Sequence, residues 1–179
     1  MPFDFPILYF IQNHMVNPIL NVIMPFLSLI GNGGAIWFVT AIILILTKKY
    51  RSCGIIILIA VIIGFLSGEL LIKNIVARPR PCYIDTTIKM LVNKPITFSF
   101  PSGHTCSSFA ASVVMLRYNK KIGIPSVALA CCIAFSRLYL FVHFPTDVLA
   151  GAALGTISSL GSYHIYNRYK PNQKLSGNI

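Results

Sequence analysis

The sequence predicts an all-α fold: a polytopic membrane helical bundle of five to six transmembrane helices with an N-terminal interfacial segment. Two observations lead to this prediction. First, 55% of the 179 residues are hydrophobic and the mean hydropathy is +0.73, well above the values typical of soluble domains. Second, the 15 Lys and Arg residues give a net charge of +11, yet they fall between long apolar stretches. A nucleic-acid-binding protein needs a soluble basic face, so the composition favours a membrane protein.

The first 30 residues are apolar but are interrupted by polar residues and prolines. We therefore expect one or two interfacial or half-inserted helices here, and the sequence leaves open whether residues 17–30 span the membrane. Because the start carries Asp4 and no basic segment, it does not resemble a cleavable signal peptide. The motif "GNGG" at Gly31–Gly34 is expected to end this segment in a tight reversal, since Gly and Asn tolerate left-handed backbone.

Five apolar segments follow, and each approaches the roughly 20 residues that a membrane-spanning helix needs. The first, at about 33–47, is short, but the basic residues that follow it can snorkel to the membrane surface. The other four are Cys53–Lys73, Ser102–Tyr118, Ile122–Leu140 and Pro145–Tyr166. The chain is thus expected to comprise an N-terminal segment (1–30), a helical-bundle core (31–167) and a cytoplasmic tail (168–179).

Basic residues form three clusters, each at the end of an apolar segment. The clusters are Lys48, Lys49 and Arg51; Arg117, Lys120 and Lys121; and Arg168, Lys170 and Lys174. If the helices alternate in direction, all three clusters lie on one side, and the positive-inside rule predicts that this side is the cytoplasm. The connections at about 74–101 and 141–144 are then expected to face outside.

Three polar motifs lie at the predicted outer ends of the helices: "KNIVARPRP" (Lys73–Pro81), "PSGH" (Pro101–His104) and "SRLYLFVHFPTD" (Ser136–Asp147). The helix that starts at Ser102 runs inward for about 25 Å at roughly 1.5 Å per residue, and the next helix returns about as far. The three motifs should therefore meet at one face. The side chains expected to converge there are Lys73, Arg80, Ser102, His104, Arg137, His143 and Asp147.

This set of residues is suited to a tetrahedral anion. Arginine makes forked bonds to phosphate oxygens, and lysine adds a point charge. Ser102 fits the N-cap of a helix, and Gly103 would let an oxyanion approach the backbone closely. Ordinary snorkelling at a membrane edge explains any one of the cations, but it explains the complete set less well.

Two histidines in the motifs fit phosphoryl-transfer chemistry. An imidazole can attack phosphorus and form a covalent intermediate, and a second imidazole can protonate the departing oxygen. His143 is followed four residues later by Asp147, in a helix that Pro145 opens. That spacing lets the carboxylate reach Nδ1 and leaves Nε2 free to attack. His104 has no carboxylate close in sequence, so it is the better proton donor, while His14 and His164 are expected to be ordinary interfacial residues.

No metal site is expected, because a two-metal phosphatase needs several carboxylates and the chain has only 4 acidic residues. Stabilisation of the transition state is left to fixed cations and backbone dipoles.

The 5 cysteines fit no metal-binding spacing and are expected to be small apolar fillers, with Cys82 the exception because it lies among the motifs. Glu69, four residues before Lys73, either forms an i,i+4 salt bridge or tunes Lys73 and supports the phosphate pocket.

Together the motifs resemble the three-part signature of the type 2 phosphatidic acid phosphatase superfamily. The match reads Lys73, six residues, Arg80-Pro81; Pro101-Ser102-Gly103-His104; and Ser136-Arg137, five residues, His143, three residues, Asp147. The resemblance covers roughly 33–166. It implies a metal-independent phosphohydrolase without a cofactor, in which His143 is the nucleophile, His104 the acid and Asp147 the orienting acid. The implied phosphate-binding residues are Lys73, Arg80, Ser102, Gly103 and Arg137, and the supporting residues are Pro81, Pro101, Ser136 and Glu69.

Members of the superfamily differ in substrate, and the signature does not separate them. Small size and an outward-facing site favour a multi-pass enzyme of the bacterial plasma membrane that hydrolyses undecaprenyl diphosphate. Phosphatidylglycerol phosphate and phosphatidate are the alternatives, and an anion or lipid transporter or a silent scaffold would be a different class. The expected partners are a lipid phosphate or diphosphate and membrane lipids, with no nucleic acid; the oligomeric state stays open.

Residues 97–101 and three aromatic residues either border the lipid opening or form an interfacial belt: Tyr139, Phe141 and Phe144.

Overall fold

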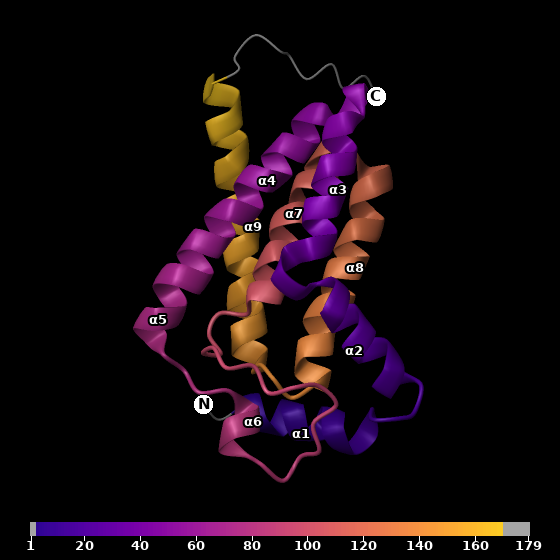
Figure 1. The fold of residues 1–179 in the computed structure, drawn as a ribbon, viewed down its shortest axis with the longest axis vertical. Coiled ribbons are helices and arrows are strands. Elements are labelled where there is room, and N and C mark those ends of the chain that lie inside the picture. Colours follow the sequence, from indigo (N-terminus) through magenta and orange to yellow (C-terminus); the bar gives the residue numbers. More distant parts are fainter. Residues whose placement is uncertain (1–2, 170–179) are drawn as a thin grey trace.

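The structure is a computed structural model that describes residues 3–169, and it is all-helical over that range, as predicted. Long helices run side by side along the long axis of the molecule (Figure 1). Helix ends that carry the basic residues of the first two clusters gather at the upper end of Figure 1, where the Tyr118 hydroxyl donates to the Lys49 carbonyl at 3.1 Å. Lys170 and Lys174 of the third cluster lie outside the described residues.

The N-terminal segment forms two helices, α1 (Asp4–His14) and α2 (Leu20–Ile30). Helix α1 lies across the lower end of the bundle in Figure 1. A 3₁₀ turn, η1 (Asn32–Gly34), joins α2 to α3 (Ala35–Leu46), and the two arms meet at a bend of 46°. Gly33 and Gly34 have φ values of +58° and +73°, so the predicted reversal is confirmed and depends on residues without a Cβ.

The next helix is longer than predicted and contains a π-helical stretch near its end. After the 3₁₀ turn η2 (Lys48–Tyr50), α4 (Arg51–Phe65) continues as a π-helical stretch, η3 (Leu66–Ile72), and then as α5 (Lys73–Val76). Figure 1 shows its lower end leaning away from the other long helices. A π-helical stretch inside an α-helix is rare and often marks a functional site. The short α6 (Pro81–Ile84) follows, with proline at its first position.

Three helices complete the bundle, and their bounds lie close to the predicted ones: α7 (Gly103–Tyr118), α8 (Lys120–Tyr139) and α9 (Pro145–Tyr169). Helix α7 is central and packs against α4, α8 and α9. Small residues allow the close approach, because membrane helices associate mainly through tight packing. A Cβ on Gly155 would overlap the Cys106 carbonyl oxygen and lie 2.8 Å from the Ala110 nitrogen.

Replacing Gly155 by alanine is therefore expected to push α9 away from α7 and to destabilise the fold by about 1–3 kcal/mol. Gly161 on the same helix is the matched control, since a Cβ there meets no atom within 4 Å. Alanine at position 161 should be neutral or stabilising by up to about 1 kcal/mol, because alanine favours helix over glycine. Thermal unfolding of the two variants in one detergent measures the difference, and equal melting temperatures would contradict the packing argument.

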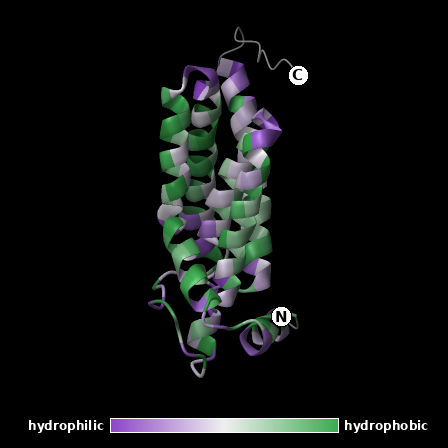
Figure 2. Cartoon of the chain, turned by 90° about the vertical axis from the view of Figure 1, so that its right-hand side faces the viewer, coloured by the Kyte–Doolittle hydropathy of each residue, from purple (hydrophilic) through white to green (hydrophobic). Residues whose placement is uncertain are grey.

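Hydrophobic residues (green) make up much of the length of the helices, and hydrophilic residues (purple) occur at the upper end, in the lower loops and at some positions within the bundle (Figure 2). By length and hydropathy, two helical stretches of the described chain can cross a membrane, Lys48–Ile84 and Lys120–Tyr139. The bent pair of α2 and α3 makes a third if it counts as one span. The protein is thus an apolar helical membrane protein, while five to six spans stay a prediction, because α7 has only 16 residues and α9 is rich in Gly and Ser.

Candidate active site

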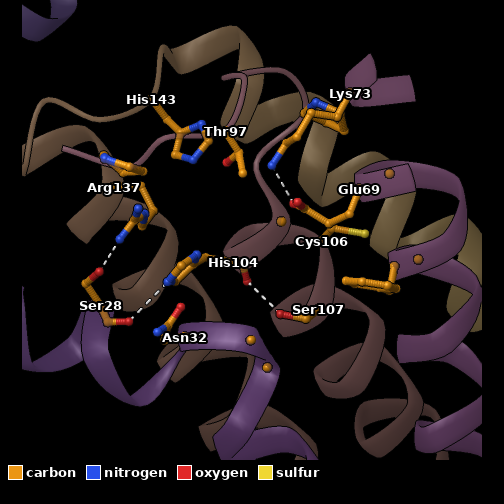
Figure 3. A pocket seen from close by; sticks show the side chains of 18 of the residues that line it. Ser28, Asn32, Glu69, Lys73, Thr97, His104, Cys106, Ser107, Arg137 and His143 are labelled. Atoms are coloured by element: carbon orange, nitrogen blue, oxygen red, sulfur yellow. Dashed lines mark hydrogen bonds and ion pairs between the residues drawn. The ribbon is translucent and has the colours of Figure 1, made fainter. Parts of the chain in front are cut away.

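A cavity of about 600 Å³ lies in the lower half of the bundle, between α2, α3, α4 with η3, and the start of α7. Side chains from all three sequence motifs line it (Figure 3). The structure therefore brings together residues that are as far apart in sequence as Lys73 and His143. The motif residues that line the cavity are Lys73, Arg80, Pro101, Gly103, His104, Arg137 and His143.

His143 lies in the turn between α8 and α9, where Phe141 adopts a positive φ of 58° and Pro145 starts the next helix. Its Nε2 is 2.9 Å from Arg80 Nη1. Because a guanidinium can only donate, Nε2 must accept, so the imidazole is neutral and carries its proton on Nδ1. Burial, with the charges of Arg80, Arg137 and Lys73 adding to it, holds the pKa of His143 well below its usual range. The lone pair of Nε2 thus faces the cavity side, as a nucleophile requires.

Asp147 lies behind His143, but the direct hydrogen bond that the spacing suggested is not made. Asp147 Oδ2 is 3.6 Å from His143 Nδ1, which is too long for a hydrogen bond. Instead Oδ2 accepts from Ser99 Oγ at 2.5 Å and from the Phe144 amide at 2.9 Å. Ser99 Oγ is itself 3.5 Å from His143 Nδ1. Ser99 was missed by sequence reasoning, and its place between the two residues comes only from the path of the 85–102 loop.

The two arginines of the cavity are held differently. Arg80 is fixed by the loops: Nε donates to the Thr97 carbonyl at 2.7 Å, Nη2 to Thr97 Oγ1 at 2.9 Å, and Nη1 also to the Val142 carbonyl at 2.9 Å. Arg137 donates through Nη1 to Ser28 Oγ, while its buried Nε has no partner among the described residues. A buried donor without a partner is costly, so this N–H is suited to an anion oxygen.

His104 lies in the first turn of α7, on the opposite side of the cavity from His143 (Figure 3). Its Nε2 is 3.2 Å from the Ser28 carbonyl oxygen of α2. Because a carbonyl only accepts, Nε2 carries a proton and is a donor in this arrangement. Ser28 thus touches both His104 and Arg137, and sequence reasoning did not identify it, because α2 contains no motif.

Ser102 is the N-cap of α7, as predicted: its Oγ accepts from Thr105 Oγ1 at 2.9 Å and from the Thr105 amide at 3.4 Å. It is fully buried and does not line the cavity. Gly103 does line the cavity, and a Cβ there would overlap Glu69 Oε1. The Glu69 carboxylate thus lies against the bare backbone at the start of α7, and the approach of a substrate oxyanion to Gly103 stays a prediction.

The predicted Glu69–Lys73 salt bridge is present, with 2.5 Å between Lys73 Nζ and Glu69 Oε1. Both residues line the cavity, and the π-helical stretch η3 contains Glu69 and ends just before Lys73. Glu69 thus sets one negative charge among the cations that line the cavity. A role for Glu69 beyond this pair stays a prediction.

The other half of the cavity is apolar. Leu29 from α2 and Ile62 and Phe65 from α4 line it, and their exposed fractions are 67%, 48% and 54%. Since the same residues belong to the outer surface, the cavity reaches the apolar side of the bundle. The site therefore joins a cluster of cationic side chains, called here the cationic cup, to exposed apolar surface of the bundle.

The aromatic residues Tyr139, Phe141 and Phe144 do not line this cavity, so the first of the two interpretations that the sequence left open for them is wrong. All three are buried, in a cluster that includes Leu8 and Ile11 of α1. Their place follows from α1, which crosses the lower end of the bundle and covers them. Thr97 and Pro101 do line the cavity, whereas Pro81, Ser136 and Cys82 are buried outside its lining.

No group of three or more His, Cys, Asp and Glu side chains within 3–169 is placed to hold a metal ion. The cup instead presents one lysine, two arginines, a free arginine N–H and two neutral imidazole faces. These groups are complementary to a phosphoryl group.

A family model described as the PAP2 superfamily matches residues 49–171. An undecaprenyl-diphosphatase of Sulfolobus acidocaldarius is 33% identical over 147 residues, which are 82% of this chain and 70% of that protein. The bacitracin transport permease protein BcrC of Bacillus licheniformis is 30% identical over 155 residues. These residues are 87% of this chain and 68% of that protein.

Two solved structures are similar in fold. The crystal structure of LpxE from Aquifex aeolicus aligns with a TM-score of 0.79 and 26% identity, over 90% of this chain and 94% of that one. The PAP2-type phosphatidylglycerolphosphate phosphatase of Bacillus subtilis aligns with a TM-score of 0.67 and 25% identity, over 89% and 80% of the two chains.

Proposed function

The chain belongs to the PAP2 superfamily of phosphatases, and from this premise we propose that it hydrolyses undecaprenyl diphosphate to undecaprenyl phosphate and inorganic phosphate. The observation that supports this substrate is the shape of the cavity, in which a cationic cup opens onto the apolar side of the bundle. A long isoprenoid chain can then stay in the lipid while its diphosphate enters the cup. The relative from Sulfolobus acidocaldarius, which is named undecaprenyl-diphosphatase, supports the same substrate.

The proposed reaction has two steps. In the first, His104 is protonated when the anionic substrate binds, His143 Nε2 attacks the terminal phosphorus, and the bond from phosphorus to the bridging oxygen breaks. The imidazolium of His104 gives one proton to that oxygen and becomes neutral. Arg80 Nη1, now bonded to Nε2 at 2.9 Å, transfers its hydrogen bond to a phosphate oxygen. In the second step a water molecule attacks the phosphohistidine, His104 takes the proton of the water, and phosphate leaves with His143 restored.

Fixed positive groups stabilise the charge that develops on the phosphoryl oxygens. Arg137 offers its unpaired Nε, Arg80 offers Nη1, and Lys73 offers an ammonium group that now faces Glu69. None of these steps requires a metal ion. We place the cup at the extracytoplasmic face, because the clusters at 48–51 and 117–121 lie at the other end of the bundle and the positive-inside rule assigns that end to the cytoplasm.

Phosphatidylglycerol phosphate is the second candidate substrate, and the similarity to the Bacillus subtilis phosphatase favours it. A transporter is the candidate from a different class, since the relative from Bacillus licheniformis is named a transport permease. A transporter has no need for one imidazole that presents a lone pair and a second that presents an N–H at the same site.

A substrate panel in detergent with excess EDTA tests the proposal. We expect phosphate release from polyprenyl diphosphate, with a kcat/KM at least about tenfold above those for phosphatidylglycerol phosphate and phosphatidate, and no loss on chelation. Preference for phosphatidylglycerol phosphate would replace the proposed substrate. Release that stops in EDTA and returns with a divalent metal would overturn the metal-independent mechanism, and no release from any lipid would favour the transporter.

A further inference from the structure

We infer that Asp4 and Arg78 are positioning residues for the reaction because they hold Asp147 behind His143. Asp4 lies outside the phosphatase signature, and Arg78 fills one of the six positions that the signature leaves unspecified between Lys73 and Arg80. With Ser99 and Thr146 they form a buried cluster, called here the Asp147 network: Asp4, Arg78, Ser99, Thr146 and Asp147. The inference rests on the proposed role of His143 as nucleophile. It makes α1, which lies outside the 49–171 family match, part of the catalytic apparatus.

Arg78 connects the two carboxylates of the network. Its Nη1 donates to Asp147 Oδ1 at 2.6 Å, and its Nη2 donates to Asp4 Oδ2 at 2.7 Å. The two carboxylate side chains are 0% and 2% exposed, and that of Arg78 is 14% exposed. The guanidinium also lies over the Phe144 ring, 3.9 Å from its centroid. Arg78 is therefore clamped from three sides in one orientation.

Asp4 fixes the outer end of the network. Its carboxylate accepts from the Thr146 amide at 3.2 Å and from Thr146 Oγ1 at 2.9 Å. Thr146 directly precedes Asp147 in the first turn of α9, so Asp4 holds the backbone and the guanidinium that together set the position of Asp147. Asp4 also starts α1, where a negative charge is favourable.

The two oxygens of the Asp147 carboxylate have different partners, and this division determines the surroundings of His143. Oδ1 faces Arg78, so Oδ2 is left for Ser99 Oγ and the Phe144 amide. Because Ser99 donates its proton to Oδ2, its oxygen presents lone pairs toward Nδ1–H of His143 at 3.5 Å. That contact favours the tautomer with an unprotonated Nε2. Without Arg78 the Asp147 carboxylate loses the partner of its Oδ1 and can rotate away from Ser99. Without Asp4 the Arg78 side chain is no longer fixed, so the same rotation becomes possible.

A purely structural role for Asp4 is the competing explanation, and α1 provides the control. The same helix has a second polar contact with the loops, from the Tyr9 hydroxyl to Asp85 Oδ2 at 2.8 Å. Both partners there are at the surface, and Asp85 also bonds Thr87, so this contact does not lead to His143. Tyr9→Phe therefore weakens the docking of α1 without touching the Asp147 network.

The test compares Asp4→Asn, Arg78→Lys and Tyr9→Phe on the lipid phosphate that the wild type hydrolyses best. For Asp4→Asn we expect kcat to fall about 10- to 100-fold, as is usual when the residue that orients a reacting group is removed, with KM within about twofold. Arg78→Lys keeps the charge but cannot bridge two carboxylates, so it should show the same selective loss of kcat. Tyr9→Phe should keep the kcat of the wild type.

A second measurement does not depend on the lipid. Orthovanadate mimics the pentavalent phosphoryl transition state, and its stabilisation of the folded protein against heat reports how well His143 is placed. Asp4→Asn should require at least about tenfold more vanadate for the same shift in melting temperature. Unchanged kcat and unchanged vanadate response in folded Asp4→Asn overturn the inference, even if its melting temperature falls. If Asp4→Asn does not fold, Arg78→Lys decides by the same criteria.

The two proposals fail in different ways. If the wild type prefers another lipid while Asp4→Asn is slow on it, the proposed substrate is wrong and the Asp147 network stands. If the wild type hydrolyses polyprenyl diphosphate and the network variants match it in kcat and vanadate response, the substrate stands and the network does not position His143.

Discussion

Replacing His143 by alanine is expected to lower phosphate release by about 10³-fold or more, since removal of a catalytic nucleophile is among the most severe single changes in an enzyme. The expectation rests on the geometry of the imidazole. It is buried, with 1% of its surface exposed, and its Nε2 accepts from Arg80 at 2.9 Å in the lining of the cavity. The loss should appear in kcat, because Lys73, Arg80 and Arg137 still bind the phosphoryl group.

His14→Ala is the matched control for this experiment. His14 is an exposed histidine at the end of α1 that bonds only the Phe10 carbonyl within its own helix, so its variant should keep the activity of the wild type. Rapid quench with a phosphorus-labelled lipid should also trap a phosphorylated protein in the wild type and none in His143→Ala. Wild-type turnover by His143→Ala would end the proposed mechanism, whichever lipid is used.

The helix ends of the bundle core could be predicted from the sequence because local signals mark them. Ser102 caps α7, Asn119 caps α8 by accepting from the Lys121 amide at 2.8 Å, and Pro145 opens α9. Each signal acts over two or three residues, so it does not depend on the rest of the fold. The meeting of the three motifs followed from the same helices, since two antiparallel helices of similar length return the chain to one face.

The partners of the motif residues could not be predicted, because they come from segments without a pattern. Ser99 reaches Asp147 across 48 positions of the chain, and Arg137 reaches Ser28 across 109. Asp4 lies far from the motifs in sequence, and Arg78 occupies an unspecified position between Lys73 and Arg80, so neither has a local signal of its role. In the structure the two residues pair with each other beside Asp147.

The position of α1 explains why the aromatic residues after α8 do not border the opening of the cavity. The sequence predicts that the first 30 residues form interfacial or half-inserted helices, but it does not say onto which surface they fold. Once α1 lies across the lower end of the bundle, Phe141 and Phe144 become its packing partners, with ring centroids of Phe5 at 6.5 and 5.2 Å. The lipid opening is consequently left to the side of the bundle between α2 and α4, where no aromatic run had marked it.

Replacing His104 by asparagine is expected to have an effect that depends on the leaving group. The Nε2–H of His104 points to the Ser28 carbonyl at 3.2 Å, and in the proposed first step the protonated imidazole transfers this proton to the departing oxygen and becomes neutral. A general acid contributes about 10²- to 10⁴-fold to rate, and its share is largest when the departing oxygen is a strong base. The alkoxide released from a lipid monophosphate is such a base, whereas the lipid phosphate released from a diphosphate is a much weaker one.

For His104→Asn we therefore expect kcat/KM to fall toward the upper end of that range with phosphatidate and toward the lower end with polyprenyl diphosphate. His164→Asn, on the exposed side of α9, should leave both values unchanged. The ratio of the two losses cancels any general damage to the cup, because binding of the phosphoryl group is common to both substrates. Equal losses would mean that His104 only helps to bind the phosphoryl group, and the proton for the departing oxygen would then have to come from another group that faces the cavity.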